Sequence, residues 1–388
     1  MLRTLSNTFN KFFDSEKSSG ILLIICTAIS VLLANSSIGP EYARLWHSTV
    51  GGLSIEHWIN DALMAVFFLL IGLELERELY VGELSNFREA LLPIFAAIGG
   101  MIAPALIYFS LNAGTTAQAG MGIPIATDIA FALGVLAIVG KRIPASLKVF
   151  VVAFAVVDDL GAIVVIATFY TAKLSIWYFA AALATWALLV TLNRFRLMPV
   201  IPYLLGGALM WFLMLRSGVH ATIAGVALAF AIPFSAKSED QQSPSHKLEH
   251  LLHKPVAFMM LPLFALANTG IPIRANWMQD LVSANSVGIT AGLVLGKPLG
   301  VTLLCFIAVG CGLCRLPSDL NWRHILGAGI LGGIGFTMSI FVANLAFAGH
   351  SDTINASKMV ILLASLMAGL VGFLWLRFFI QPAAHGNA

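Results

Sequence analysis

Charged side chains are scarce in this sequence. Only 11% of the 388 residues are Asp, Glu, Lys or Arg, whereas 59% are hydrophobic. A water-soluble globular protein carries about 25% charged residues, so this composition excludes an ordinary soluble protein. The mean hydropathy of +0.90 indicates a chain built for the lipid bilayer. The formal net charge of +3 gives no reason to expect nucleic acid as a partner.

Cysteine is also rare, and the four that occur are too few for a disulfide framework. Cys311 and Cys314 form a C-x-x-C pair, but no second pair or histidine cluster follows at zinc spacing. No glycine-rich phosphate loop follows a strand, which argues against direct coupling to nucleotide hydrolysis. We therefore expect neither a cofactor nor a structural metal.

No cleavable signal peptide precedes the first apolar run. Residues 1–18 mix charges with phenylalanines, which predicts a short amphipathic stretch at the membrane surface.

Apolar segments long enough to cross a bilayer as helices, about 20 residues each, recur along the whole chain. We count twelve, which predicts an all-α polytopic membrane protein forming a single domain over residues 1–388, with both termini on one side. The predicted spans are 20–35, 58–80, 90–112, 120–140, 147–171, 175–193, 199–215, 218–234, 251–271, 286–313, 324–348 and 357–380.

The distribution of basic residues orients these spans. One of the 22 lysines and arginines, Lys297, lies inside a span. Five lie in the loops opposite the termini, namely Arg44, Lys173, Arg216, Arg274 and Lys358. The other sixteen lie in the termini and in the loops on their side. Because cytoplasmic loops are enriched in Lys and Arg, we predict that both termini are cytoplasmic.

Two loops differ from short connections. Residues 48–56 contain Gly51-Gly52 between two short runs typical of strands, which favours a β-hairpin on the outer face. Residues 235–254 are polar and charged and lead into a cytoplasmic helix start. An ordinary solvated loop is the alternative in both cases.

Two spans are interrupted near their centres. GIPIATDIAFALG at 122–134 has Pro124 before a polar Thr127-Asp128 pair, and GGIGFTMSIFVANL at 332–345 has glycines before polar residues. These are the fourth and eleventh spans, so they cross the membrane in opposite directions. The third and tenth spans share a Gly-then-Pro break, so spans 3–5 and 10–12 are predicted to be inverted-topology repeats. Interrupted segments at corresponding positions point to a transporter's binding site.

Four ionisable residues lie deep within apolar spans: Asp128, Asp158, Asp159 and Lys297. Each costs about 2.5–3.5 kcal/mol at a helix centre. A structural salt bridge would use one aspartate with Lys297 and leave two aspartates unexplained. Neighbouring helix residues point about 100° apart, so Asp158 and Asp159 face different surroundings. One can face Lys297, and the other can hold either a proton or a small hard cation.

Eight motifs, in this order, closely resemble the NhaA family of bacterial sodium/proton antiporters over nearly the full length. They are WINDALMAVFFLLIGLE (58–74), AAIGGMIAPAL (96–106), ATDIAFALGVLA (126–137), DDLGAI (158–163), SGVHAT (217–222), LPLFALAN (261–268), GKPLG (296–300) and GIGFTMSIF (333–341).

The resemblance implies a secondary active transporter of the bacterial inner membrane, and not an enzyme. It would exchange cytoplasmic Na⁺ or Li⁺ for periplasmic H⁺ electrogenically by alternating access. It implies Asp159 as main cation ligand and proton carrier, Asp158 as a Na⁺ ligand that exchanges its pairing with Lys297, and Thr127 and Asp128 at the helix crossing. Residues 90–171 and 286–380 would form the ion-translocating core, and 20–80 and 175–271 the interface half.

The resemblance also implies activation at alkaline pH and a homodimer formed through the outer hairpin, in contact with membrane lipid. The matching pH-sensing residues are Glu74, Arg77, Glu78, His220, Glu249, His250 and His253. Here His246-Lys247 precedes the L-E-H motif where a basic pair stands in the family, and the segment between the first two spans also diverges. The alternatives are a sodium-coupled solute symporter, which needs a larger polar pocket, and a passive cation channel, which a lysine beside the acidic site suits poorly.

Overall fold

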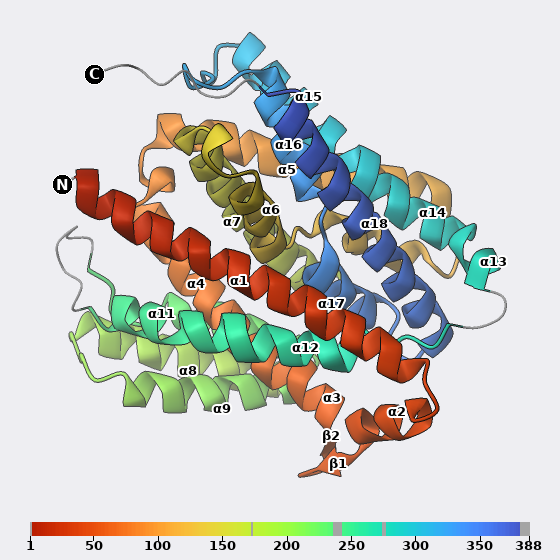
Figure 1. Cartoon of the computed structure of the whole chain (residues 1–388). Helices are drawn as coiled ribbons and strands as arrows, with labels where there is room; N and C mark the ends of the chain where they lie inside the picture. Colours follow the sequence, from red (N-terminus) through yellow and green to blue (C-terminus); the bar gives the residue numbers. More distant parts are fainter. Residues whose placement is uncertain (1, 172–173, 236–242, 274–276, 381–388) are drawn as a thin grey trace. The chain divides into compact units, whose positions relative to one another are not determined.

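The described part of the chain folds almost entirely into helices, with one two-stranded ribbon (Figure 1). This computed structural model describes residues 2–171, 174–235, 243–273 and 277–380. The α-helices are α1 Leu2–Ala34, α2 Gly39–His47, α3 Ile55–Trp58, α4 Met64–Tyr80, α5 Phe87–Asn112, α6 Ile129–Val139, α7 Ala145–Phe169, α8 Ile176–Arg194, α9 Ile201–Ser217, α10 Ile223–Ala229, α11 Pro244–Pro255, α12 Leu261–Asn268, α13 Trp277–Leu281, α14 Ala284–Ala291, α15 Lys297–Gly310, α16 Trp322–Gly332, α17 Phe336–Ala346 and α18 Ser351–Phe378. The strands are β1 Thr49–Val50 and β2 Leu53–Ser54.

Tighter and wider turns join several of these helices. The π-helical turns Ile59–Leu63, Val256–Met260 and Gly292–Gly296 join α3 to α4, α11 to α12 and α14 to α15. Residues Glu83–Ser85, Gln118–Ile125 and Gly140–Arg142 form 3₁₀ turns. The loop predicted at 235–254 becomes α11 from Pro244 onward, while residues 236–242 lie outside the described residues.

Within the described part of the chain, eight helical segments are long and apolar enough to cross a membrane, or up to ten if each of two bent pairs counts as one span. The sequence predicts twelve spans, which is two more than the upper figure of ten. The segment predicted at 218–234 contains only the seven residues of α10, because Gly218 ends α9 in the left-handed region and Pro233 follows. The number twelve stays a prediction.

The N-terminal stretch that the sequence predicts to be amphipathic is helical in the structure. It continues without a break into the first predicted span, and both belong to α1. Neither Gly nor Pro occurs before Gly20, so no helix-breaking residue separates the polar part from the apolar part.

Contacts divide the chain into two compact units. Unit 1 comprises Met1–Val31, Asn86–Ala162 and Ile271–Ala388, and unit 2 comprises Leu32–Ser85 and Ile163–Gly270. Each unit is assembled from segments that lie far apart in the sequence. All four deep ionisable residues of the predicted ion site belong to unit 1, and all predicted pH-sensing residues belong to unit 2.

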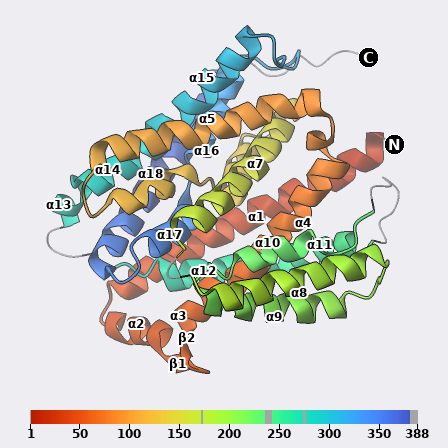
Figure 2. The same ribbon diagram turned by 180° about the vertical axis from the view of Figure 1, so that it is seen from behind.

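In unit 1, α5 packs along α15 so closely that the two backbones touch (Figures 1 and 2). A Cβ atom on Gly99 would lie 2.1 Å from the carbonyl oxygen of Gly300, and one on Gly300 would lie 2.1 Å from that of Gly99. Small residues at a helix interface permit this close approach. In a membrane the hydrophobic effect does not drive helices together, so close van der Waals packing stabilises the pair instead.

In unit 2, α8 and α9 lie side by side (Figure 2), and α4 packs against α10. The core of this unit combines large apolar side chains of α4, α9 and α11 with alanines of α8 and α10. Gly51 and Gly52 adopt φ values of +62° and +88° between β1 and β2, the backbone that a two-residue hairpin requires.

Replacing Gly99 by Ala is expected to destabilise unit 1 by about 1–3 kcal/mol, because the new methyl group meets a backbone oxygen that cannot rotate away. The measurement is the thermal unfolding midpoint of the detergent-purified protein. Gly134→Ala is the control, since Gly134 is a helical glycine of α6 with no atom within 4 Å of the added Cβ. Equal midpoints for the two variants would contradict the prediction.

Candidate functional site

The two interrupted spans meet at their breaks, and both lie in unit 1. After the 3₁₀ turn Gln118–Ile125, residues 126–128 are extended before α6 begins. Residues 333–335 separate α16 from α17, whose axes bend by 47°. The backbone N–H of Asp128 donates to the carbonyl oxygen of Ile334 at 2.6 Å, and the Thr127 hydroxyl donates to that of Gly332 at 2.8 Å. The breaks therefore satisfy part of each other's hydrogen bonding.

Local sequence explains why each helix stops here. Pro124 lacks a backbone N–H and disfavours helical continuation, and Asp128 is a favourable N-cap for the next helix. In the other break, a Cβ atom on Gly335 would lie 2.1 Å from the Ser339 hydroxyl oxygen and 3.1 Å from the carbonyl oxygen of Ala126. A side chain at this position would displace the Ser339 hydroxyl and press against the backbone of the other break.

One carboxylate serves the N-termini of both half-helices. Oδ1 of Asp128 accepts a hydrogen bond from the N–H of Phe131 in α6 at 3.2 Å. Oδ2 accepts from the N–H of Thr337 in α17 at 3.1 Å and also from the Thr337 hydroxyl. Helix N-termini carry about half a positive charge each. Asp128, only 3% exposed, therefore places its negative charge where two such termini converge.

Serine hydroxyls pair further backbone groups at the crossing. Ser339 donates to the carbonyl oxygen of Ile123 at 2.7 Å, and Ser365 of α18 accepts from the N–H of Phe336 at 3.0 Å. Both serines are buried. A buried backbone group without a partner costs several kcal/mol in an apolar environment, so these hydroxyls allow the interrupted helices to exist at this depth.

Lys297 forms an ion pair with Asp158 of α7. The distance from Nζ to Oδ2 is 2.7 Å, and both side chains are fully buried. The ring of Phe154 lies 5.6 Å from the same Nζ. Oδ1 of Asp158 has no hydrogen-bond partner among the described residues.

Asp159 is the next residue of α7 and is 2% exposed. It is close enough to Lys297 to interact with it electrostatically, but the hydrogen bond goes to Asp158. Thr127 lies beside the Asp158 carboxylate. The structure thus brings together all five residues that the sequence proposed for the ion site. Together they supply three carboxylates, one lysine charge and the Thr127 hydroxyl.

No group of three or more His, Cys, Asp or Glu side chains that could hold a metal ion occurs among the described residues. A transported cation would be a substrate and not a resident metal of this kind.

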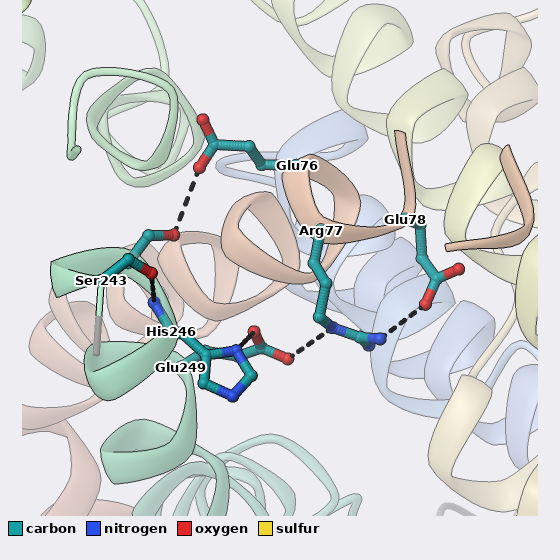
Figure 3. A network of polar contacts seen from close by, with 7 residues as sticks. Glu76, Arg77, Glu78, Ser243, His246 and Glu249 are labelled. Carbon is teal, nitrogen blue, oxygen red and sulfur yellow. Dashed lines mark hydrogen bonds and ion pairs between the residues drawn. The ribbon is translucent and has the colours of Figure 1, made fainter. Parts of the chain in front are cut away.

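The proposed pH-sensing residues do not form one group. Arg77 of α4 bridges Glu78 and Glu249, with distances of 2.9 Å to each carboxylate (Figure 3). Glu74 contributes electrostatically to Arg77. His246 of α11 lies 3.8 Å from Glu249. This Arg77 cluster joins the end of α4 to the first turns of α11.

The predicted histidines lie at different places. His250 is exposed, and His253 is partly buried further along α11. His220 lies in the connection between α9 and α10 and interacts with His57. His57 and Arg77 are separated by roughly 30 Å of helix. The structure therefore does not bring His220 to the Arg77 cluster.

Three residues at or near these sites were missed by sequence reasoning. Thr337 follows the glycines of the second break, and this position beside a helix interruption could have marked it as a site residue. Ser365 is an isolated serine in an apolar span, so nothing in the sequence marked it. Glu76 is 5% exposed and accepts a hydrogen bond from Ser245 at 3.2 Å (Figure 3). It was overlooked because it stands among charged neighbours.

This arrangement of crossed half-helices and buried carboxylates can now be compared with known proteins. The family model described as Na+/H+ antiporter 1 matches residues 10–376. The chain belongs to the Na+/H+ antiporter 1 family. The resemblance drawn from the eight motifs is thereby confirmed.

Relatives in this family cover nearly the whole chain. The Na(+)/H(+) antiporter NhaA of Dechloromonas aromatica (strain RCB) is 69% identical over 97% of this chain and 97% of its own length. NhaA of Cytophaga hutchinsonii is 56% identical over 96% of both chains. NhaA of Vibrio campbellii is 47% identical over 98% of this chain and 97% of its own. These relatives are antiporters, that is, transporters and not enzymes. With its apolar helices, this member of the Na+/H+ antiporter 1 family is a multi-pass membrane protein.

Lys297→Met is expected to destabilise the protein by about 3–5 kcal/mol, because it leaves the Asp158 carboxylate buried without its counter-charge. The double variant Lys297→Met with Asp158→Asn is expected to recover most of this loss. Thermal unfolding midpoints in detergent measure both. A double variant no more stable than Lys297→Met alone would contradict a direct pairing of the two charges.

Proposed function

We propose that this protein exports cytoplasmic Na⁺, or Li⁺, in exchange for periplasmic H⁺ across a bacterial inner membrane. The observation that supports this most directly is the pair of adjacent buried aspartates, one bound to Lys297 and the other beside it, at a crossing of two interrupted helices. Membership of the Na+/H+ antiporter 1 family supports the choice of ions. Hard carboxylate oxygens suit small hard cations.

Asp159 would carry the travelling ion. A buried carboxylate can hold a proton or a cation, but each excludes the other from the same oxygens. Protons arriving from the periplasm would displace Na⁺, and Na⁺ arriving from the cytoplasm would displace the proton. This competition couples the two fluxes, provided that the site faces only one side of the membrane at a time.

Asp158 and Lys297 would add a second step to the cycle. When Na⁺ binds between the aspartates, Asp158 turns toward the cation and its attraction for Lys297 weakens. Lys297 can then release a proton, and it regains one when Na⁺ leaves. One proton carried by Asp159 and one by Lys297 for each Na⁺ would move net positive charge inward. Exchange would then be electrogenic.

Alternating access would use the inverted repeats, spans 3–5 and 10–12, within a twelve-span protein whose termini are cytoplasmic. Residues 90–171 and 286–380 would form the moving core, and 20–80 and 175–271 the half against which it moves. The ion-site residues belong to unit 1, so they would travel together. The hairpin β1–β2, continuous with α3, would provide the contact of a homodimer within the lipid bilayer.

Activation at alkaline pH would originate in the Arg77 cluster. Arg77 is held between two carboxylates that belong to different helices, and His246 stands beside one of them. Loss of protons from such a cluster changes the attraction between α4 and α11. Within this proposal, Glu74, Glu78 and Glu249 act through Arg77, whereas His220, His250 and His253 act elsewhere in unit 2.

Everted membrane vesicles test the central proposal. With an acid interior imposed, adding Na⁺ at alkaline pH is expected to collapse the pH gradient, as followed by a pH-sensitive dye. Asp159→Asn is expected to abolish this response in a protein that is still folded and inserted. Asp280→Asn, in α13 of the same unit, is the control. A wild-type protein that moves no protons on Na⁺ addition would refute the proposal, and an active Asp159→Asn variant would remove Asp159 from the site.

The pH dependence provides a second test. Glu249→Gln removes a negative charge from the Arg77 cluster, so neighbouring groups attract protons less strongly and lose them at lower pH. We expect half-maximal activation to move to lower pH by about half a unit or more. The control is Lys247→Gln, an exposed charge in the same helix. An unchanged activation profile for Glu249→Gln would exclude the cluster as the origin of the pH response.

A further inference from the structure

A buried polar cluster outside the ion site connects four elements of unit 1. The Tyr108 hydroxyl, on fully buried Tyr108 near the end of α5, lies 2.8 Å from the carbonyl oxygen of Ala117 and 2.7 Å from Oδ1 of Asn285 in α14. Nδ2 of Asn285 donates to the Ser357 hydroxyl of α18 at 2.8 Å. The cluster thus runs from α18 through α14 and α5 to the start of the 3₁₀ turn Gln118–Ile125.

The surrounding backbone is shaped to admit this tyrosine. A Cβ atom on Gly120 would lie 2.3 Å from the Tyr108 hydroxyl oxygen, and one on Gly288 would lie 2.8 Å from its ring. Asn112, one turn along α5, donates to the carbonyl oxygens of Tyr108 and Ala284, each at 3.0 Å. Both glycines would therefore collide with the cluster if they carried any side chain.

The 3₁₀ turn Gln118–Ile125, called the 3₁₀ leg below, is the first half of the interrupted span. Different groups hold its two ends. At the far end, Ser339 donates to the carbonyl oxygen of Ile123 beside the ion site. At the near end, the carbonyl oxygen of Ala117 accepts from both Tyr108 and the N–H of Gly120, the latter at 2.9 Å. The internal hydrogen bonds of this leg hold it less firmly than those of an α-helix would, because 3₁₀ hydrogen-bond geometry is poorer.

We propose that Tyr108 is a positioning residue for ion exchange: its hydroxyl fixes the 3₁₀ leg, and through it Thr127 and Asp128, in the geometry that binds the cation. This inference rests on the proposed exchange function. Every member of the cluster lies in unit 1, so the cluster holds the ion-bearing unit together and does not act as a gate between units. Asn285 and Ser357 tie Tyr108 to α14 and α18.

Tyr108→Phe tests the proposal because it keeps the ring and removes only the hydroxyl. Tyr203→Phe is the matched control, since Tyr203 is equally buried and its hydroxyl donates to a backbone carbonyl, that of Leu197 at 3.0 Å, in unit 2. We expect Tyr108→Phe to raise the Na⁺ concentration for half-maximal exchange three- to tenfold, and Tyr203→Phe to leave it unchanged.

Hydrogen exchange gives a readout that does not depend on transport. Amide protons of residues 118–127 are expected to exchange about tenfold faster in Tyr108→Phe than in the wild type or in Tyr203→Phe. If the wild type moves no protons with Na⁺, the proposed function fails, while the amide exchange still decides whether Tyr108 anchors the leg. Equal exchange of residues 118–127 in both variants overturns the proposal, and so does an unchanged Na⁺ requirement in Tyr108→Phe.

Ser357→Ala provides a second variant should Tyr108→Phe fail to fold. It removes the final hydroxyl of the cluster without touching the 3₁₀ leg. We expect the same changes to a smaller degree, and their absence counts against the proposal.

Discussion

The pairing of backbone polar groups where two helices stop inside the membrane-spanning part of unit 1 is the constraint on which the rest of this structure depends. Irregular backbone at that depth survives only when protein or water satisfies its N–H and C=O groups. Here the two breaks bond to each other, and Asp128, Thr127, Ser339 and Ser365 supply the remaining partners. The irregular backbone at both breaks is therefore hydrogen-bonded within the protein.

The same constraint gives the buried charged side chains different partners. Asp128 accepts hydrogen bonds from both half-helix N-termini, so its negative charge is already engaged. Lys297 engages Asp158 at 2.7 Å, and Asp159 stands beside that pair. The buried aspartates therefore differ in their partners: Asp128 binds helix N-termini and Asp158 binds Lys297.

Much of the fold was predictable, although not all of it. The all-helical membrane class follows from composition, and both interruptions follow from Pro124 and from the glycines before Thr337. The number of twelve spans stays a prediction, because hydropathy does not register Gly218, which ends α9 and leaves α10 only seven residues long. Nor did the sequence reveal that α1 runs unbroken from Leu2. Amphipathic and apolar stretches differ in composition, yet one helix can contain both.

The sequence by itself determined which residues carry charge into the membrane, where the helices must break, and the family to which the chain belongs. Only the tertiary structure showed that Asp158, the partner implied by the resemblance, forms the ion pair with Lys297, that one carboxylate serves two helix ends, and that Ser365 accepts from the backbone of the broken span. The reason is geometric. Asp158 and Asp159 are chemically identical neighbours, and their partner lies on a helix far along the chain, so sequence spacing cannot tell which of them faces it.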